Sequence, residues 1–296
     1  MNKIRLVVAL ISLLAAASPA WALSGHTDWG AWRFDWEVKD GAGVALRNVQ
    51  YGGELVLYKV SMPVIRVKYE GDECGPYADR LDVYNLQPTT CSAEVCQRSY
   101  TLGGHEWLEV GMMAQIGGYQ IYQAWYLSDD GQIQPHVWSR RYHCQITHDH
   151  HAYWRLDIDV RGAASDQVFV YDSNRPNEGW GSGWHKYTNE LNEVKSPATN
   201  RRWFVRDSSS GHGVWVLPGT ADGTPDSWSN RDVAPRLYNY SEDEPWPFNA
   251  GELGYDNNDG LQEKDVVFWY VAHLHHPYPG DPNEWHHAGP RLRVHQ

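Results

Sequence analysis

Apolar and polar residues alternate in short segments along most of this chain, and Gly, Asp, Asn and Pro separate the segments. This pattern is typical of β-strands that bury one face and are joined by turns. Helical periodicity is nearly absent, although one short helix is expected near 190–194. We therefore predict a large all-β antiparallel sandwich in which 163–201 and 219–261 form long loops. The expected strands span 54–60, 64–69, 119–127, 133–137, 203–205, 213–217 and 265–272.

Aromatic residues are abundant, with 16 Trp and 18 Tyr. They supply large buried areas, so they fit a core between two sheets. Aromatic rings also line sugar-binding clefts, but the core is their commoner place in a β-sandwich. The length suits one such domain, which we expect over residues 23–296.

One predicted strand carries candidate metal ligands at its start. His148 and His150 are two residues apart, so they project from one face of the strand, and an apolar row follows them as far as Val160. Neutral imidazoles in a dry environment suit Cu, Zn or Ni. The opposite row holds Asp157 and Asp159, which favour a hard cation bound through oxygen.

The first 22 residues have the features of a secretory signal peptide. Lys3 and Arg5 precede an apolar run over 6–17, and residues 20–22 form an A-x-A cleavage site. The run is too short to span a bilayer, and no later segment is long and apolar enough to do so. We expect an exported protein, periplasmic or secreted, without membrane insertion.

The chain is acidic, with a net charge of −12 that becomes more negative when Lys3 and Arg5 are removed. Such a charge argues against nucleic acids and anionic membranes as partners. A cationic substrate is compatible with it.

Four cysteines follow the signal peptide. An even number in an exported protein favours disulfides. Three pairings are open, and Cys91 and Cys96 are near enough in sequence to close a small loop. The other two are Cys74 and Cys144.

Several stretches, in one order along the chain, resemble motifs of the copper amine oxidase catalytic domain. The pair His148 and His150, with the R-L-D-x-D run that follows, resembles the family's H-x-H strand. Tyr119, with Trp125 six residues later, resembles the segment around the family's cofactor tyrosine. The set covers most of residues 32–292. The other matching stretches are 57–72, Tyr77-Ala78-Asp79, 236–240 with Pro247 and Phe248, 265–269 and Glu284-Trp285.

The resemblance implies a copper ion held by His148, His150 and His276. It selects His276 because the family's third ligand lies eleven residues after the Asp of a D-x-V-x-W motif. Spacing alone would favour His273 and His275, which are two residues apart like the first pair. The fold implied is the catalytic β-sandwich of the family.

The resemblance also implies an organic cofactor and a reaction. Tyr119 would be the precursor of topaquinone, and Tyr69 would hydrogen-bond it. Asp79 would be the catalytic base, with Asp82 as a rival. A primary amine and oxygen would be the small-molecule partners, and oxidative deamination would give an aldehyde, ammonia and hydrogen peroxide. A second, calcium-like site would use Asp157, Asp159 and Asp265.

Four departures from the family pattern leave alternatives open. Gly118 replaces an Asn, and Gln120 replaces an acid. The interval 119–148 is too short for the hairpin arm through which family members dimerise, so a homodimer stays undecided, and the family's N-terminal domains are missing. The alternatives are a copper enzyme with unmodified Tyr119 acting on another substrate such as a peptide, a non-enzymatic periplasmic copper-binding protein, and a zinc hydrolase.

Overall fold

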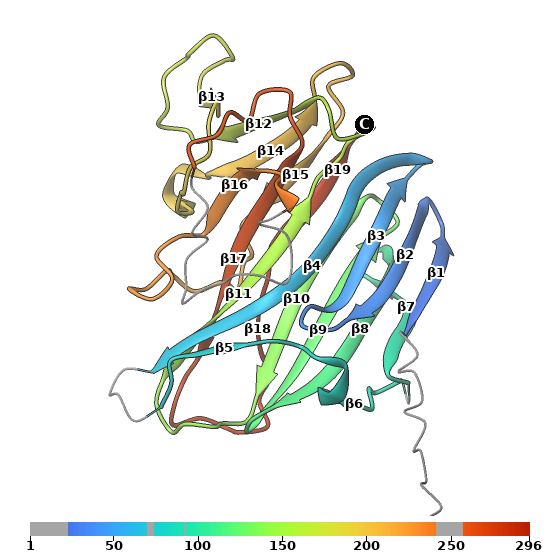
Figure 1. The fold of residues 1–296 in the computed structure, drawn as a ribbon, viewed down its shortest axis with the longest axis vertical. Helices are drawn as coiled ribbons and strands as arrows, with labels where there is room; N and C mark the ends of the chain where they lie inside the picture. Colours follow the sequence, from blue (N-terminus) through green and yellow to red (C-terminus); the bar gives the residue numbers. More distant parts are fainter. Residues whose placement is uncertain (1–22, 70–73, 92, 241–256) are drawn as a thin grey trace, which may run out of the picture.

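The computed structural model describes residues 23–69, 74–91, 93–240 and 257–296. The expected signal peptide, residues 1–22, lies outside these ranges. Two large antiparallel β-sheets form the described chain (Figure 1), so the predicted all-β sandwich is confirmed. Short 3-10 helices, η1 (Val83–Asn85) and η2 (Pro197–Thr199), lie between strands. None of the helices in these ranges could span a lipid bilayer.

The first sheet has eight strands. In spatial order they are β1 (Ser24–Trp29), β2 (Trp32–Lys39), β3 (Gly43–Tyr51), β4 (Glu54–Tyr69), β11 (His148–Asp157), β17 (Val266–His276) and β16 (Val233–Leu237), and β5 (Tyr77–Asp79) pairs with β4. Three segments that are far apart in sequence, β4, β11 and β17, are therefore neighbours. Figure 1 shows them running side by side across the front of the molecule.

The second sheet has eleven strands. In spatial order they are β13 (Trp184–Lys186), β12 (Asp166–Tyr171), β14 (Arg202–Asp207), β15 (Gly213–Leu217), β19 (Arg291–His295), β10 (Gln132–Arg140), β9 (Tyr119–Ser128), β8 (His105–Ile116) and β6 (Leu86–Gln87). Two more strands join at the side of this order, where β7 (Val95–Leu102) pairs with β8 and β18 (His286–Ala288) pairs with β10.

A proline marks an irregularity in the central strand β4. The sequence predicts two shorter strands here, but Glu54–Tyr69 is one continuous strand. Its register against β11 shifts between the pairs Tyr153↔Val64 and Arg155↔Ser61, which places Pro63 in a β-bulge. A bulge accommodates proline because the ladder there does not require the N–H that proline lacks.

The core lies between the two sheets and is rich in aromatic side chains, as the sequence predicts. Trp154 of β11 and Trp125 of β9 are fully buried, with their ring centroids 5.1 Å apart at a steep angle. The indole of Trp125 also donates a hydrogen bond of 2.7 Å to the carbonyl of Val44. Trp154 follows His148 and His150 on the same face of β11, so the two imidazoles point into the space between the sheets.

The prediction of a short helix near 190–194 is wrong. Residues there are extended, with a bridge between Glu193 and Val233. The Glu190 carboxylate is buried and accepts hydrogen bonds from the backbone N–H groups of Leu237 and Asn257, at 3.0 and 2.8 Å. These contacts hold the segment against β16 and replace the hydrogen bonds that a helix would form.

The long loops expected over 163–201 and 219–261 are only partly correct. The first contains β12 and β13, and the second contains β16. Each of these strands is short and lies between polar, glycine-rich stretches. Because the segment as a whole is polar, its pattern did not indicate the strand. The prediction of disulfides is confirmed, and the pairs are Cys74–Cys144 and Cys91–Cys96.

Candidate metal centre

Strand pairing brings the candidate metal ligands together at one end of the sandwich. His148 is the first residue of β11, and it pairs with His276 at the end of β17 and with Tyr69 at the end of β4. Tyr119 is the first residue of β9 in the opposing sheet. Four side chains from four strands therefore reach the same space, although their residues span more than two hundred positions.

His148, His150 and His276 form a compact cluster. One ring nitrogen from each lies within 4.8 Å of the others. The Nε2 atoms of His148 and His150 are 2.8 Å apart, and the ring of His276 is 5.1 Å from that of His148 and 5.6 Å from that of His150. All three side chains are buried. This convergence of imidazoles is what a metal with nitrogen ligands requires.

The hydrogen-bonding state of the rings fits metal binding. The Nδ1 of His148 lies 2.7 Å from the carbonyl of Ile146 and donates its proton there, which leaves the Nε2 lone pair facing the cluster. Both ring nitrogens of His276 are buried without a hydrogen-bond partner. Burial lowers the pKa of all three imidazoles, that of His276 to about 3, so the rings are neutral. Three neutral, buried imidazoles, of which His276 has no hydrogen-bond partner for either nitrogen, fit a copper ion.

The alternative ligands His273 and His275 face away from this cluster. They lie on the opposite side of β17 from His276, because side chains alternate along a strand. His275 is exposed and pairs with Asp149 at 3.0 Å. His273 is fully buried, and its Nδ1 lies 2.7 Å from the Nδ1 of His151. The spacing argument for these two residues is therefore not supported by the geometry.

A buried polar network behind the metal centre was not anticipated from the sequence. His151 and His273 are completely buried, and each is also held by a carboxylate, Asp226 at 3.1 Å and Asp232 at 3.1 Å. Both aspartates come from the loop that precedes β16. His151, which directly follows the H-x-H pair, is the only sequence signal for this network. Its partners cannot be identified from the sequence because they lie far from it along the chain.

Tyr119 lies directly beside the histidine cluster. Its hydroxyl is 3.1 Å from the Nε2 of His148 and 2.8 Å from the hydroxyl of Tyr69. Its ring centroid is 4.8 Å from that of His150. The side chain is buried, and burial raises the pKa of its hydroxyl, so the group is a neutral phenol in this environment.

A loop packs over Tyr119 and explains the glycine that precedes it. A Cβ atom on Gly118 would lie 2.4 Å from the backbone oxygen of Tyr142, so no larger residue fits. The ring of Tyr142 packs against His276 at 4.8 Å, and the Cys74–Cys144 disulfide attaches the same loop to the segment after β4. This loop could not be predicted from the sequence, because its residues carry no motif.

The side chain of Gln120 has a structural partner. Its Oε1 atom accepts a hydrogen bond of 2.7 Å from the Nε of Arg140 on the neighbouring strand β10. The guanidinium of Arg140 in turn lies over the ring of Trp285, 4.5 Å from its centroid. The side chain of Gln120, which stands where the copper amine oxidase motif has an acid, therefore connects β9 with β10.

Asp79, the predicted base, lies at the edge of the same site. It belongs to β5, where it pairs with Ile65 of β4. Burial raises its pKa to about 6, while the nearby His143 lowers it, and its charge in turn raises the pKa of both Tyr69 and Tyr119. Asp82, the rival, precedes η1 and hydrogen-bonds Tyr84.

A second cluster holds the predicted oxygen ligands. Asp157, Asp159 and Asp265 each place a carboxylate oxygen within 4.8 Å of the others. Arg155 pairs with Asp157 at 3.0 Å. Asp166, which was not predicted, is also buried here, and burial with the neighbouring carboxylates raises its pKa to about 9 and that of Asp159 to about 7. Such crowding of carboxylates fits a bound cation.

Solved structures of amine oxidases have the same fold as this chain. At 14% sequence identity in each case, the chain matches an amine oxidase from Aspergillus nidulans with a TM-score of 0.74, a lysyl oxidase from Pichia pastoris at 0.68 and a copper-containing benzylamine oxidase from Hansenula polymorpha at 0.68. Each match covers 91% of this chain, but only 51%, 51% and 59% of the respective proteins. No family model and no curated protein matches the chain. The resemblance to copper amine oxidases is thus confirmed for the fold.

Proposed function

We propose that this protein is an exported copper-dependent oxidase of primary amines, and that Tyr119 is the precursor of its topaquinone. The observation that carries the proposal is the position of the Tyr119 hydroxyl, 3.1 Å from the Nε2 of His148 and beside three buried imidazoles. Copper bound there would have nitrogen ligands that suit it and a phenol within reach. The amine oxidase fold supports the same assignment.

The bound copper and quinone would supply the oxidation of a primary amine to an aldehyde, with release of ammonia and reduction of oxygen to hydrogen peroxide. The chain's own residues hold and orient these groups. His148, His150 and His276 hold the metal. Tyr69, 2.8 Å from the Tyr119 oxygen, fixes the orientation of that ring.

Asp79 is the residue that we assign to proton abstraction. A general base must be unprotonated before the reaction and close to the substrate carbon. Its pKa of about 6 leaves it ionised at neutral pH while keeping appreciable affinity for a proton. The charge of its carboxylate contributes to the raised pKa of both Tyr69 and Tyr119, which supports a role beside the reacting ring.

The compartment and the second cation belong to the same proposal. We assign residues 1–22 to a signal peptide and 23–296 to one domain in the periplasm or outside the cell, and the two disulfides support an oxidising compartment. The cluster of Asp157, Asp159 and Asp265, joined by Asp166, would bind calcium. The acidic chain would still have no affinity for nucleic acid.

The proposal is tested by loading the metal-free protein with copper in air and measuring hydrogen peroxide and ammonia formed from benzylamine and from butylamine. We expect turnover of at least one amine, and none by Tyr119→Phe, which keeps the ring but loses the oxygen. A protein that binds one copper ion and forms neither product would contradict the proposal. It would favour the alternative of a copper protein with unmodified Tyr119.

A further inference from the structure

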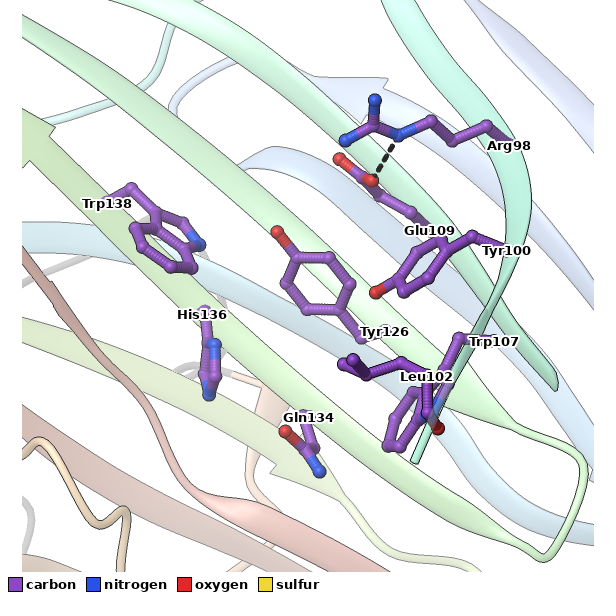
Figure 2. Close-up of a pocket in the computed structure, with 9 residues that line it drawn as sticks. All are labelled: Arg98, Tyr100, Leu102, Trp107, Glu109, Tyr126, Gln134, His136 and Trp138. Carbon is purple, nitrogen blue, oxygen red and sulfur yellow. Dashed lines mark hydrogen bonds and ion pairs between the residues drawn. The ribbon is translucent and has the colours of Figure 1, made fainter. Parts of the chain in front are cut away.

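The outer face of the second sheet carries a groove that the proposed oxidation does not use. Figure 2 shows Tyr126 at its centre, with Arg98 and Glu109 along one side and His136 and Trp138 along the other. The groove encloses about 510 Å³. It is lined by residues of four adjacent strands, β7 to β10, which Figure 2 labels.

Two small residues on this face leave room for the side chain of Tyr122, which fills the space above them. Gly111 of β8 pairs with Ala124 of β9, and Ala124 pairs with His136 of β10. A Cβ atom on Gly111 would lie 2.5 Å from the hydroxyl of Tyr122, so a larger residue is excluded there. The larger side chains of Tyr122 and Tyr126 lie two residues before and after Ala124, and therefore on the same face of the sheet.

The groove is elongated. A second hollow of about 190 Å³ shares Arg98, Glu109, Tyr126 and Trp138 with the first. It continues past them to Thr90, Met113, Tyr122 and Trp285. The four shared residues place the two hollows side by side along the sheet, so a chain of linked units can reach from one to the other.

The charges of the lining cancel within the groove. The Nε of Arg98 lies 2.6 Å from Glu109, whose side chain is only 1% exposed, and the hydroxyl of Tyr122 also donates to that carboxylate. His136 is neutral, because burial and the nearby His287 lower its pKa to about 3. A cationic ligand would find no free carboxylate in this lining, and an anionic ligand would find Arg98 already paired.

Polar groups stand beside the aromatic faces. The side chain of Arg98 is 54% exposed, and the side chains of Gln134 and Tyr100 also line the groove. A purely apolar ligand would bury these groups without hydrogen bonds, which is unfavourable. A sugar ring has an apolar face that can stack on an aromatic ring and a rim of hydroxyl groups that can bond to such polar groups.

We propose that this groove binds a neutral, linear oligosaccharide, which stacks on Tyr100, Tyr126 and Trp138. The elongated shape, the cancelled charges and the alternation of rings with hydrogen-bonding groups all match that ligand. The groove lies on the outer face of the second sheet, whereas the copper centre lies between the sheets. Binding there therefore does not depend on copper or on the proposed oxidase activity.

The test uses isothermal titration of the exported chain with cellohexaose, maltohexaose and N-acetylchitohexaose, and with choline as an organic-cation probe. We expect saturable binding of at least one hexasaccharide and none of choline. Trp138→Ala and Tyr100→Ala should each weaken that binding roughly tenfold or more, as expected for a central aromatic contact. Two variants are used because Trp138 also packs on His287, with ring centroids 4.1 Å apart, and its removal could perturb folding.

The matched control is Trp180→Ala. Trp180 is 49% exposed and lines a separate aromatic hollow with Phe169 and Trp184. The Trp180→Ala substitution should leave the affinity for the hexasaccharide unchanged. The proposal is overturned if none of the three hexasaccharides binds, if both folded groove variants bind as tightly as the parent, or if light scattering shows a dimer that Trp138→Ala dissociates, since a second copy would then cover the groove.

Discussion

At the scale of single residues, Tyr119 determines which chemistry the site can perform. Three imidazoles suffice for copper, but the proposed amine oxidation also requires the oxygen that Tyr119 holds beside them. Sequence comparison located Tyr119 by its distance from Trp125 and from the H-x-H pair. It could not show that Gly118 is required by the backbone of Tyr142, because that contact depends on a loop without any sequence signature.

The pH dependence of turnover should report the state of Asp79. Its pKa is raised to about 6, so the carboxylate is protonated and inactive as a base below that pH and ionised above it. We expect kcat/KM to rise with pH through about 6 and then to level off. Asp79→Asn should lower kcat roughly 10²–10⁴-fold, the usual contribution of a general base.

Asp82→Asn is the matched control for Asp79, since Asp82 lies three residues later and is the rival base. It should retain most of the activity and the same rise near pH 6. If Asp82→Asn abolishes turnover while Asp79→Asn retains it, the assignment of the base is wrong.

At the scale of elements, the pairing of β11 with β17 supports His276 as the proposed third ligand. The register aligns His148 with His276, so alternation along the strand directs His273 and His275 to the other face. The existence of both strands and the H-x-H face could be predicted from alternation. Their register could not, because it depends on pairing between segments that are more than a hundred residues apart.

Replacement of the third ligand should therefore affect copper binding selectively. His276→Ala should lower copper affinity by more than the roughly 10–100-fold that loss of an outer-shell partner causes. His275→Ala, an exposed neighbour on the opposite face, should leave the affinity unchanged. Titration of the metal-free variants with copper, followed by its visible absorption, makes the comparison. Full affinity in His276→Ala would contradict the ligand assignment.

Gly118 should be intolerant of any side chain. A Cβ atom there would overlap the backbone of the covering loop, and such overpacking costs about 1–3 kcal/mol. We expect Gly118→Ala to lower the free energy of unfolding by that amount in urea denaturation. Gly260→Ala is the control, because the nearest atom to its Cβ would be 3.9 Å away. Equal stability of the two variants would show that the loop is not packed as described.

At the scale of the whole molecule, the sequence predicted the class of fold but not its full extent. Strong alternation identified strands such as 119–127 and 265–272. The strands β12, β13 and β16 were missed because they are short and lie in polar surroundings. The expected helix near 190–194 was wrong because Glu190 is used as a buried hydrogen-bond acceptor, a tertiary contact that overrides local preference.

Calcium should stabilise the whole sandwich through the carboxylate cluster. A ligand that binds only the folded state at about 100 times its Kd adds about 2.7 kcal/mol, so we expect the melting temperature to rise with added CaCl2. Asp159→Asn should abolish this rise. Without calcium, the same variant should be more stable than the parent above pH 7, because an ionised Asp159 with a pKa raised to about 7 disfavours folding there.

Asp129→Asn, in a separate acidic group with His105 and Asp130, should preserve the effect of calcium. Equal calcium responses of the parent and of Asp159→Asn would exclude this cluster as the binding site.

The most direct test of the central claim is the mass of the peptide that contains Tyr119 before and after copper loading in air. We expect a gain in mass corresponding to oxidation of Tyr119 to topaquinone, together with a positive quinone stain. The gain should be absent without oxygen and absent in His276→Ala. An unchanged mass in a protein that has bound copper would contradict the account and leave a copper site with an ordinary tyrosine beside it.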